Sequence, residues 1–154
     1  MTGRPKVKRA VYEKLIEYQK LLEEKTTEEL AHHLKLLTNM EKHMDRIRGV
    51  RVSYEKQLYE KQTKGEKSPV VIAYINYLEK LDNDLIEGKK EIDRIKRKID
   101  EIKNKLIQIR QKKKKFEKLD EKQKANYLKE LEQEELKKLN EFSVHSFNSR
   151  NGKS

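Results

Sequence analysis

The stretch that decides the fold is KQTKGEKSPVVIAYINYLEKL, residues 61–81, which interrupts long runs of charged, helix-forming residues on both of its sides. Gly65 suits the left-handed conformation that ends a helix, while Ser68 and Pro69 suit the cap and the first turn of the next helix. Pro69 also disfavours helical geometry at Ser68. One continuous helix is therefore not expected, and so short a connection favours two antiparallel helices.

The composition favours long helices over a thick globular core. Of the 154 residues, 34% are hydrophobic and 42% are charged, which leaves too few apolar side chains to enclose such a core. Lys, Glu, Leu and Ile dominate, as they do in coiled coils. The absence of cysteine excludes a disulfide framework and thiolate metal sites. We expect an all-α, elongated protein.

Apolar residues downstream of the break recur at alternating steps of three and four, the pattern of a left-handed coiled coil. Ten of twelve such positions are apolar in the series Leu78, Leu81, Leu85, Gly88, Ile92, Ile95, Ile99, Ile102, Leu106, Ile109, Lys113 and Phe116. The upstream half carries a rougher stripe of Leu15, Tyr18, Leu22, Thr26, Leu30, His33, Leu37, Met40, Met44, Ile47, Arg51, Tyr54 and Leu58. Successive steps of four between Tyr18 and Leu30 predict a locally unwound and more weakly packed region.

These patterns together predict a long antiparallel two-helix coiled-coil hairpin that forms a single domain over residues 1–142. The expected parts are a first helix over about 8–62, a turn at 63–68, a second helix over about 69–142 and a disordered tail at 143–154. Folding about the turn pairs residues whose numbers sum to roughly 132, which places Met44 opposite Gly88. A glycine inside a helix costs about 1 kcal/mol relative to alanine. Gly88 therefore indicates either a close approach of Met44 or simple tolerance.

The second helix is predicted to be longer than the first, so residues beyond about 125 have no partner within the hairpin. The apolar pattern nevertheless continues there, at Leu128, Leu131, Leu136, Leu139 and Phe142. An unpartnered helix end would expose these side chains to water. We therefore expect a binding partner at this end of the chain.

The sequence carries no pattern typical of an enzyme. It has four histidines, and it lacks a glycine-rich phosphate loop and a nucleophile motif. Glu29 and His32 have the Glu-x-x-His spacing of di-iron bundles, but such sites need a second copy and two further glutamates. We expect no enzymatic activity, no catalytic or metal-binding residues, no cofactor and no small-molecule substrate.

A net charge of +11 and a pI near 9.6 favour acidic partners. Two basic clusters stand out, at residues 3–9 and 110–118, and the first contains a Gly-Arg-Pro core like that of minor-groove hooks. Aromatic residues suited to base stacking are not interleaved with them. A basic coiled-coil protein that binds nucleic acid is the alternative function. Neither a secretory signal nor an 18-residue apolar run is present, so a soluble, intracellular protein is expected.

Two segments resemble the FliJ family of flagellar type III export proteins. They are IAYINYLEKLDNDLIEGKKEI at residues 72–92 and KKKKFEKLDEKQKANYLKELEQEELKKLNEFSVHSF at residues 112–147. The family's second helix begins with aromatic-Ile-x-x-Leu-Glu-Lys, which is matched from Tyr74, and closes near Asp-Glu-Phe. The closing motif here reads Asn140-Glu141-Phe142, a departure at its first position.

The resemblance implies a non-enzymatic stalk similar to the gamma subunit of rotary ATP synthases. Its terminal end would enter the hexameric flagellar export ATPase and promote ring assembly and activity, and its other region would contact the membrane export gate. Export chaperones are a further implied class of partner, and nucleic acid is not implied. The implied location is cytoplasmic, peripheral at the cytoplasmic face of the export apparatus, with motility and chemotaxis as the processes served.

The resemblance also assigns residues to these contacts. The family's gate-binding positions match Tyr74, Leu78, Leu81 and Leu85. The last two positions are small and polar in a member of the family, whereas both are Leu here, and Leu78, Leu81 and Leu85 also belong to the predicted seam. A basic cluster beside an exposed apolar helix end would suit a ring with an acidic lining. The expected ATPase-binding residues are Lys112, Lys113, Lys114, Lys115, Leu128, Leu131, Leu139 and Phe142.

Overall fold

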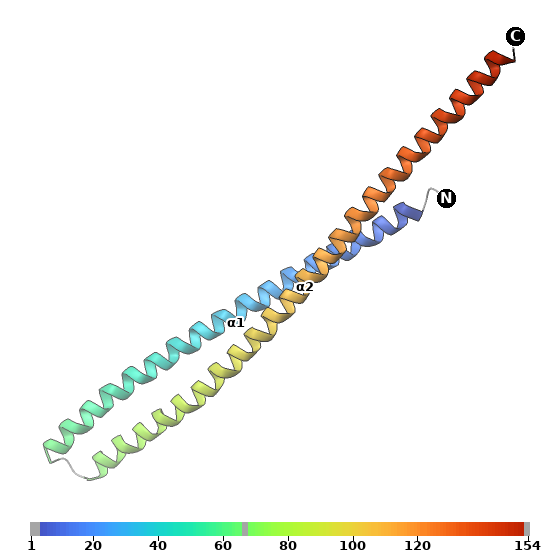
Figure 1. Cartoon of the computed structure of the whole chain (residues 1–154). Helices are drawn as coiled ribbons and strands as arrows, with labels where there is room; N and C mark the ends of the chain where they lie inside the picture. The colour runs from blue at the N-terminus through green and yellow to red at the C-terminus, as the bar shows by residue number, and fades with distance from the viewer. Residues whose placement is uncertain (1–3, 66–67, 153–154) are drawn as a thin grey trace. The chain divides into compact units, whose positions relative to one another are not determined.

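The computed structural model describes residues 4–65 and 68–152, with side chains from residue 11 onward. Two helices account for almost all of this chain: α1 spans Arg4–Thr63 and α2 spans Ser68–Asn151 (Figure 1). No strand occurs in the described ranges. The two helices pack against one another, so the predicted all-α helical hairpin is confirmed.

The break between the helices lies where the sequence predicts it. Gly65 adopts a φ of 70°, a left-handed conformation that costs glycine little and a residue with a side chain more. Its N–H donates to the carbonyl of Gln62 at 3.2 Å, and the N–H of Lys64 donates to the carbonyl of Glu60 at 3.1 Å. These bonds satisfy carbonyls at the end of α1 that lack a helical partner. After residues 66–67, which lie outside the described ranges, α2 opens with Ser68 and Pro69.

The end of α2 differs from the prediction. The helix was expected to stop near Phe142 and to be followed by a disordered tail, but it continues to Asn151. No glycine or proline occurs between Pro69 and Gly152 other than Gly88, so nothing in the covalent chain forces an earlier end. The N–H of Gly152 donates to the carbonyl of Asn148 at 2.9 Å and closes the last turn. Polar composition was therefore a poor indicator of disorder here.

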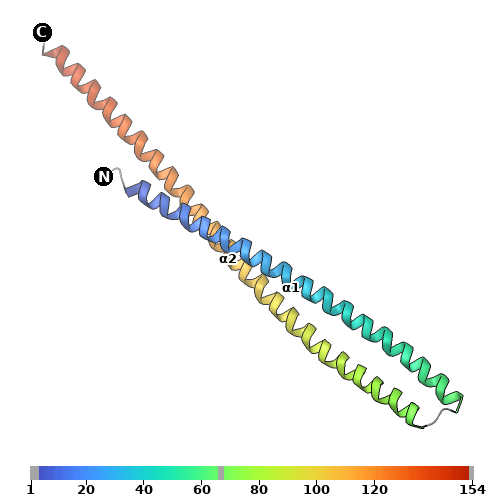
Figure 2. The same cartoon turned by 180° about the vertical axis from the view of Figure 1, so that it is seen from behind.

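The contacts divide the chain into two units, residues 24–107 and residues 1–23 together with 108–154. In the first unit α1 and α2 run antiparallel on either side of the turn, as the views from front and back show (Figures 1 and 2). Arg51 of α1 forms an ion pair with Asp82 of α2, and the Tyr54 ring lies 4.4 Å from that of Tyr77 between centroids. The pairing follows the register expected for folding about residue 66.

The predicted seam of α2 is confirmed, because none of its twelve positions is exposed and six are buried. The buried ones are Leu81, Gly88, Ile99, Ile102, Leu106 and Ile109. Burying a leucine or isoleucine side chain stabilises a protein by about 1.5–3 kcal/mol. This stripe is therefore the main source of stability in the hairpin.

The stripe of α1 needs one correction near its start. The sequence pattern places Tyr18 in the seam, but its side chain is 56% exposed. Gln19, which is 6% exposed, occupies the seam position instead. Gln19 lies four residues after Leu15 and three before Leu22, so the alternation of coiled-coil steps holds up to that point. Only the two steps of four through Thr26 remain irregular, a shorter interruption than predicted.

The seam of the second unit is unusually polar. Gln19 Oε1, Asp120 Oδ1 and Gln123 Oε1 are buried and have no hydrogen-bond partner among the described residues. The other carboxylate oxygen of Asp120 forms an ion pair with Lys124 Nζ at 3.1 Å. A buried acceptor without a partner costs about 1–3 kcal/mol. The polar atoms buried in this seam therefore weaken the pairing of the helices in the second unit.

Met44 fills the space that Gly88 leaves open. A Cβ atom at Gly88 would overlap the Met44 sulfur and would also come within 3.3 Å of Met40 Cε. Met44 is itself almost fully buried, so its side chain has little room to turn away. Of the two sequence-based explanations for Gly88, the structure supports a close approach over simple tolerance.

This contact predicts a non-additive pair of substitutions. Gly88→Ala alone should lower the free energy of unfolding by about 1 kcal/mol, because overpacking outweighs the gain in helix propensity. In a Met44→Ala background the same change should raise it by about 1 kcal/mol, since the methyl group then fills a cavity. Urea denaturation followed by circular dichroism measures all four proteins, and simple additivity of the two changes would contradict this packing.

Candidate functional site

The four residues assigned to the gate lie on the side of α2 that faces α1. Leu81 is only 5% exposed, and Tyr74, Leu78 and Leu85 are half-buried. The Tyr74 hydroxyl donates to Gln57 Oε1 at 3.1 Å, and its ring lies 5.5 Å from that of Tyr54. These side chains therefore hold the two helices together, and Tyr74 contacts α1 through both its ring and its hydroxyl.

A different set of apolar residues faces away from α1 in the same part of α2. Ile72, Ile75 and Ile86 are 54%, 40% and 55% exposed. Their separations of three and eleven residues are close to one and three helical turns, at about 3.6 residues per turn, so they share a face. We call Ile72, Ile75 and Ile86 the isoleucine face. The sequence alone does not single this face out, because the heptad pattern of the neighbouring leucines is the stronger periodic signal there.

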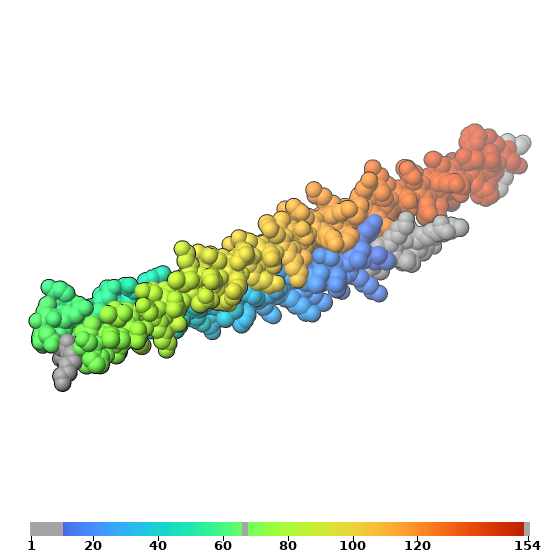
Figure 3. All heavy atoms as spheres, turned by 90° about the horizontal axis from the view of Figure 1, so that it is seen from below, coloured from blue at the N-terminus to red at the C-terminus, as the bar shows by residue number. Residues whose placement is uncertain are grey.

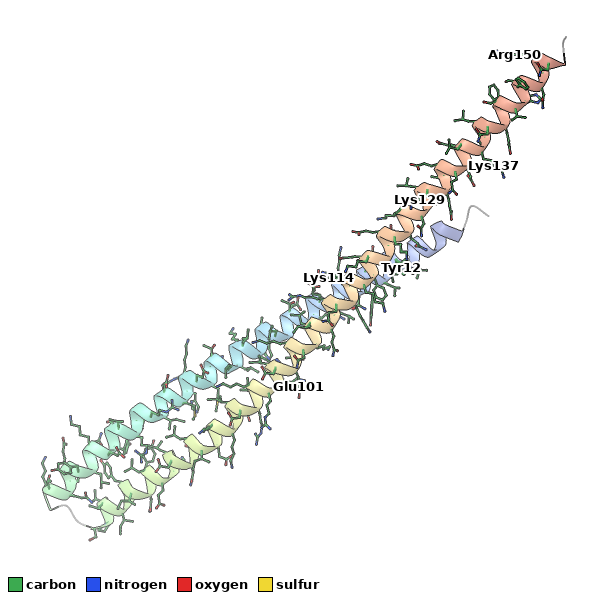
Figure 4. All side chains as sticks on the ribbon, viewed as in Figure 1. Tyr12, Glu101, Lys114, Lys129, Lys137 and Arg150 are labelled. Carbon is green, nitrogen blue, oxygen red and sulfur yellow. The ribbon has the colours of Figure 1, made fainter. Side chains whose placement is uncertain are left out.

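We call Lys112, Lys113, Lys114 and Lys115 the lysine cluster. One of these side chains is paired with a carboxylate of α1, and the other three are exposed. Lys113 Nζ donates to Glu23 Oε2 of α1 at 2.8 Å, and both side chains are about three-quarters buried. Arg110 lies 3.8 Å from the same carboxylate. Lys112, Lys114 and Lys115 are exposed, and Lys114 is labelled in Figure 4. The residues that remain accessible for an acidic partner are therefore these three and not Lys113.

The contact with Lys113 also changes the acidity of Glu23. The hydrogen bond from the Lys113 ammonium lowers the pKa of the Glu23 carboxyl below its ordinary value, and the charges of Lys113 and Arg110 act in the same direction. Partial burial opposes this shift. The ionised pair thus stabilises this unit of the hairpin whenever Glu23 is deprotonated.

The apolar residues predicted to bind the ATPase are all exposed. We call Leu128, Leu131, Leu139 and Phe142 the terminal stripe; their exposure ranges from 39% at Leu131 to 71% at Phe142. The segment that carries them is the orange-to-red part of α2 in Figure 3, and Lys129 and Lys137 lie along it in Figure 4. Scattered exposed apolar residues are ordinary, but several on one face of a helix indicate a contact surface.

The terminal stripe is out of phase with the hairpin seam. The seam continues through Phe116, Asp120, Gln123 and Tyr127, all buried or half-buried, and its next position would be Glu130. The terminal stripe instead begins at Leu128 and repeats after eleven residues, because Leu128 recurs as Leu139 and Leu131 as Phe142. An eleven-residue repeat does not suit a left-handed coiled coil. The terminal stripe is therefore a surface of its own and not the unused end of the seam.

Three further exposed apolar residues lie between and beyond those of the terminal stripe. They are Leu136, Val144 and Phe147. Leu136 and Phe147 are again eleven residues apart and fall on a neighbouring face of the helix. Val144 and Phe147 were missed because the predicted helix ended at Phe142.

The described residues hold no cluster of three or more His, Cys, Asp or Glu side chains that could bind a metal ion. The His33 ring nitrogen Nδ1 lies 2.8 Å from the carbonyl of Glu29, within its own helix. In the part of the chain that the structure describes, neither helix has a stretch apolar and long enough to cross a membrane. The candidate functional surfaces are thus all helix faces.

Comparison with known protein families identifies a family that this chain matches. A family model described as "Flagellar FliJ protein" matches residues 9–152, nearly the whole chain. No curated protein and no solved structure matches the chain. The family match covers both helices and includes the isoleucine face, the lysine cluster and the terminal stripe.

The ion pair of Glu23 predicts a stability difference that depends on pH. Glu23→Gln should lower the free energy of unfolding by about 0.5–1 kcal/mol at neutral pH, because it removes the ionised partner of Lys113. The pKa of Glu23 is lowered in the folded state, so the difference should be full above the ordinary carboxyl value and vanish as the pH falls through the lowered pKa. Thermal or urea unfolding across pH measures it.

The matched control is Glu24→Gln, the same chemical change at the exposed neighbouring residue. It should leave stability unchanged at every pH. A Glu23→Gln protein as stable as the parent at neutral pH would show that the pair with Lys113 contributes nothing measurable.

Proposed function

Because the chain belongs to the FliJ family and is therefore a component of the flagellar protein export apparatus, we propose that it is a non-enzymatic stalk of that apparatus. The terminal part of α2 binds the hexameric export ATPase and promotes its ring assembly and activity. The part of the hairpin near the turn contacts the membrane export gate. The protein works in the cytoplasm, at the cytoplasmic face of the apparatus, and export chaperones are further candidate partners.

The terminal stripe is the observation that carries the ATPase half of this proposal. Leu128, Leu131, Leu139 and Phe142 are exposed, share one side of a helix, and are out of phase with the seam that binds α1. Apolar anchors of this kind concentrate binding energy, and truncation of one costs about 2 kcal/mol or more. A partner that surrounds the helix end would cover them together with Leu136 and Phe147.

The exposed lysines supply the charge for the same contact. Lys112, Lys114 and Lys115 precede the terminal stripe on α2, whereas Lys113 is paired with Glu23 and serves the hairpin. An acidic ring lining would be attracted by these three cations. A stalk that binds the assembled ring better than the separate subunits shifts the equilibrium towards the ring by mass action.

The gate half of the proposal rests on the family resemblance around Tyr74. Tyr74 is half-buried and keeps part of its ring accessible, so it remains a candidate for direct contact. Leu81 is buried by α1, and Leu78 and Leu85 share the same seam. We propose that these three leucines act by holding α2 in place and that Tyr74 touches the partner.

The alternative function, nucleic-acid binding, has less support from the structure than from the sequence. Within the basic segment 110–118, Arg110 and Lys113 form ion pairs with the Glu23 carboxylate, at 3.8 and 2.8 Å. The side chains of the other basic segment, residues 3–9, lie outside the described residues. Nucleic acid remains a competing outcome for any binding experiment with the intact chain.

Loss of ATPase stimulation on truncation of the terminal stripe tests the proposal. Leu139→Ala combined with Phe142→Ala should abolish stimulation of the export ATPase of the same organism, because two exposed anchors are removed. Helicity and thermal stability should stay near those of the parent, since neither side chain is packed within the hairpin. ATP hydrolysis and ring formation are measured with this chain added at a concentration stoichiometric with the ATPase.

Val52→Ala combined with Tyr59→Ala is the matched control, because these α1 residues are equally exposed apolar side chains elsewhere. This variant should stimulate like the parent. If the unaltered chain changes neither hydrolysis nor ring formation, the stalk proposal is wrong. Retardation of DNA or RNA that weakens steeply with salt would instead support the alternative.

A further inference from the structure

The isoleucine face is an apolar surface that the hairpin does not use. Ile72, Ile75 and Ile86 point away from the seam, and each is at least 40% exposed. The seam between the helices is already occupied by other residues, such as Tyr74 against Tyr54. Three large branched side chains on one outward face of a helix are costly to leave in water.

The isoleucine face lies in an acidic part of a basic protein. Residues 68–93 contain three lysines and six acidic residues, a net charge of −3, whereas the whole chain carries +11. Glu79 lies four residues after Ile75 and seven before Ile86, which places it on the same face. It is exposed and makes no ion pair within the described part of the chain.

Three neighbouring carboxylates are already paired within the hairpin. Asp82 accepts hydrogen bonds from Arg51 of α1, which lowers the pKa of Asp82. Glu87 lies 3.2 Å from Lys90, and Glu91 lies 2.8 Å from Arg94. On this face between Ile75 and Ile86, Glu79 is therefore the carboxylate that makes no ion pair in the described part of the chain and can attract a basic partner.

This charge distribution distinguishes a protein partner from a lipid surface. Helices that lie on membranes carry lysine and arginine beside their apolar face, because the lipid headgroups are anionic. The isoleucine face carries a glutamate in its centre, and the segment around it is acidic. An anionic membrane would repel it, whereas an apolar groove that presents a lysine or arginine would complement it.

We infer that the isoleucine face is a docking surface for a helix-binding apolar groove with a basic residue opposite Glu79. Ile72 and Ile75 are anchors at the i, i+3 spacing with which amphipathic helices fill such grooves, and Ile86 is a third anchor about three helical turns further along the same face. Glu79 fixes the register of the helix in the groove. The inference rests on the proposed function, because the partner proposed for this part of the chain is the export gate. It adds to the contact of Tyr74 a second contact, on a face of α2 that is not part of the seam.

The test measures binding of the intact chain to the purified cytoplasmic part of the gate protein. Ile72→Ser combined with Ile75→Ser should weaken binding at least about tenfold, since two anchors are lost. Glu79→Lys should weaken it several-fold at low salt, and the difference from the parent should shrink as salt screens the charge. Circular dichroism should show parental helicity for both variants, because neither change touches the seam.

Val50→Ser combined with Val52→Ser, which alters exposed valines of α1 in the same unit, should bind like the parent. If the parent binds the gate and the isoleucine variant binds equally well, the inference is wrong while the proposed function stands. If the parent does not bind the gate at all, both the inference and the gate half of the proposed function are wrong. Flotation of the parent, but not the isoleucine variant, with anionic phosphatidylserine vesicles would also overturn the inference in favour of a membrane surface.

Discussion

Burial of one stripe of α2 against α1 constrains every other surface of this protein. A side chain that packs in the seam cannot also serve a partner, so the seam separates residues that hold the hairpin from residues that can bind. Ile99, Ile102 and Leu106 illustrate the first group, since each is buried between the helices. Gly88 belongs to it as well, because its missing side chain makes room for Met44. The isoleucine face and the terminal stripe are what the seam leaves exposed.

The composition of the seam changes between the two units. The unit at residues 24–107 buries mainly leucine, isoleucine and methionine, whereas the seam of the other unit includes Gln19, Lys113 and Asp120. Buried polar atoms without partners reduce stability, and regions of low stability open locally more often. The unit proposed to bind the ATPase is therefore also the one whose helix pairing is held less tightly.

Much of the fold was predictable because its signals are local. Gly65 and Pro69 mark the break through their own backbone preferences, and heptad spacing alone identified the seam of α2. Tyr18 was misassigned because hydrophobicity favoured tyrosine, although the spacing favours Gln19, whose neighbours keep it buried. The end of α2 was placed too early because a polar composition does not stop a helix that meets no glycine or proline between Gly88 and Gly152.

The candidate surfaces were only partly predictable, because exposure depends on which face α1 covers. The terminal stripe was found because the sequence places it beyond the partner helix. The isoleucine face belongs to the part of α2 that pairs with α1, so its position in the sequence does not place it outside the hairpin. Its exposure follows only from the rotation of α2 about its own axis. The ion pair that makes Lys113 unavailable to a partner likewise depends on Glu23, a residue ninety positions away. Local motifs do not record such long-range pairings.

Amide hydrogen exchange of the intact chain, with and without its export ATPase, tests most directly the claim that the seam and the partner surfaces are separate. In the chain alone, peptides from residues 92–109 of α2 should be protected and peptides from 128–151 should exchange rapidly, since only the former are packed. Adding the ATPase should protect residues 128–142 and leave the seam peptides unchanged. Strong protection of 128–142 in the isolated chain, or new protection confined to the seam, would contradict the account.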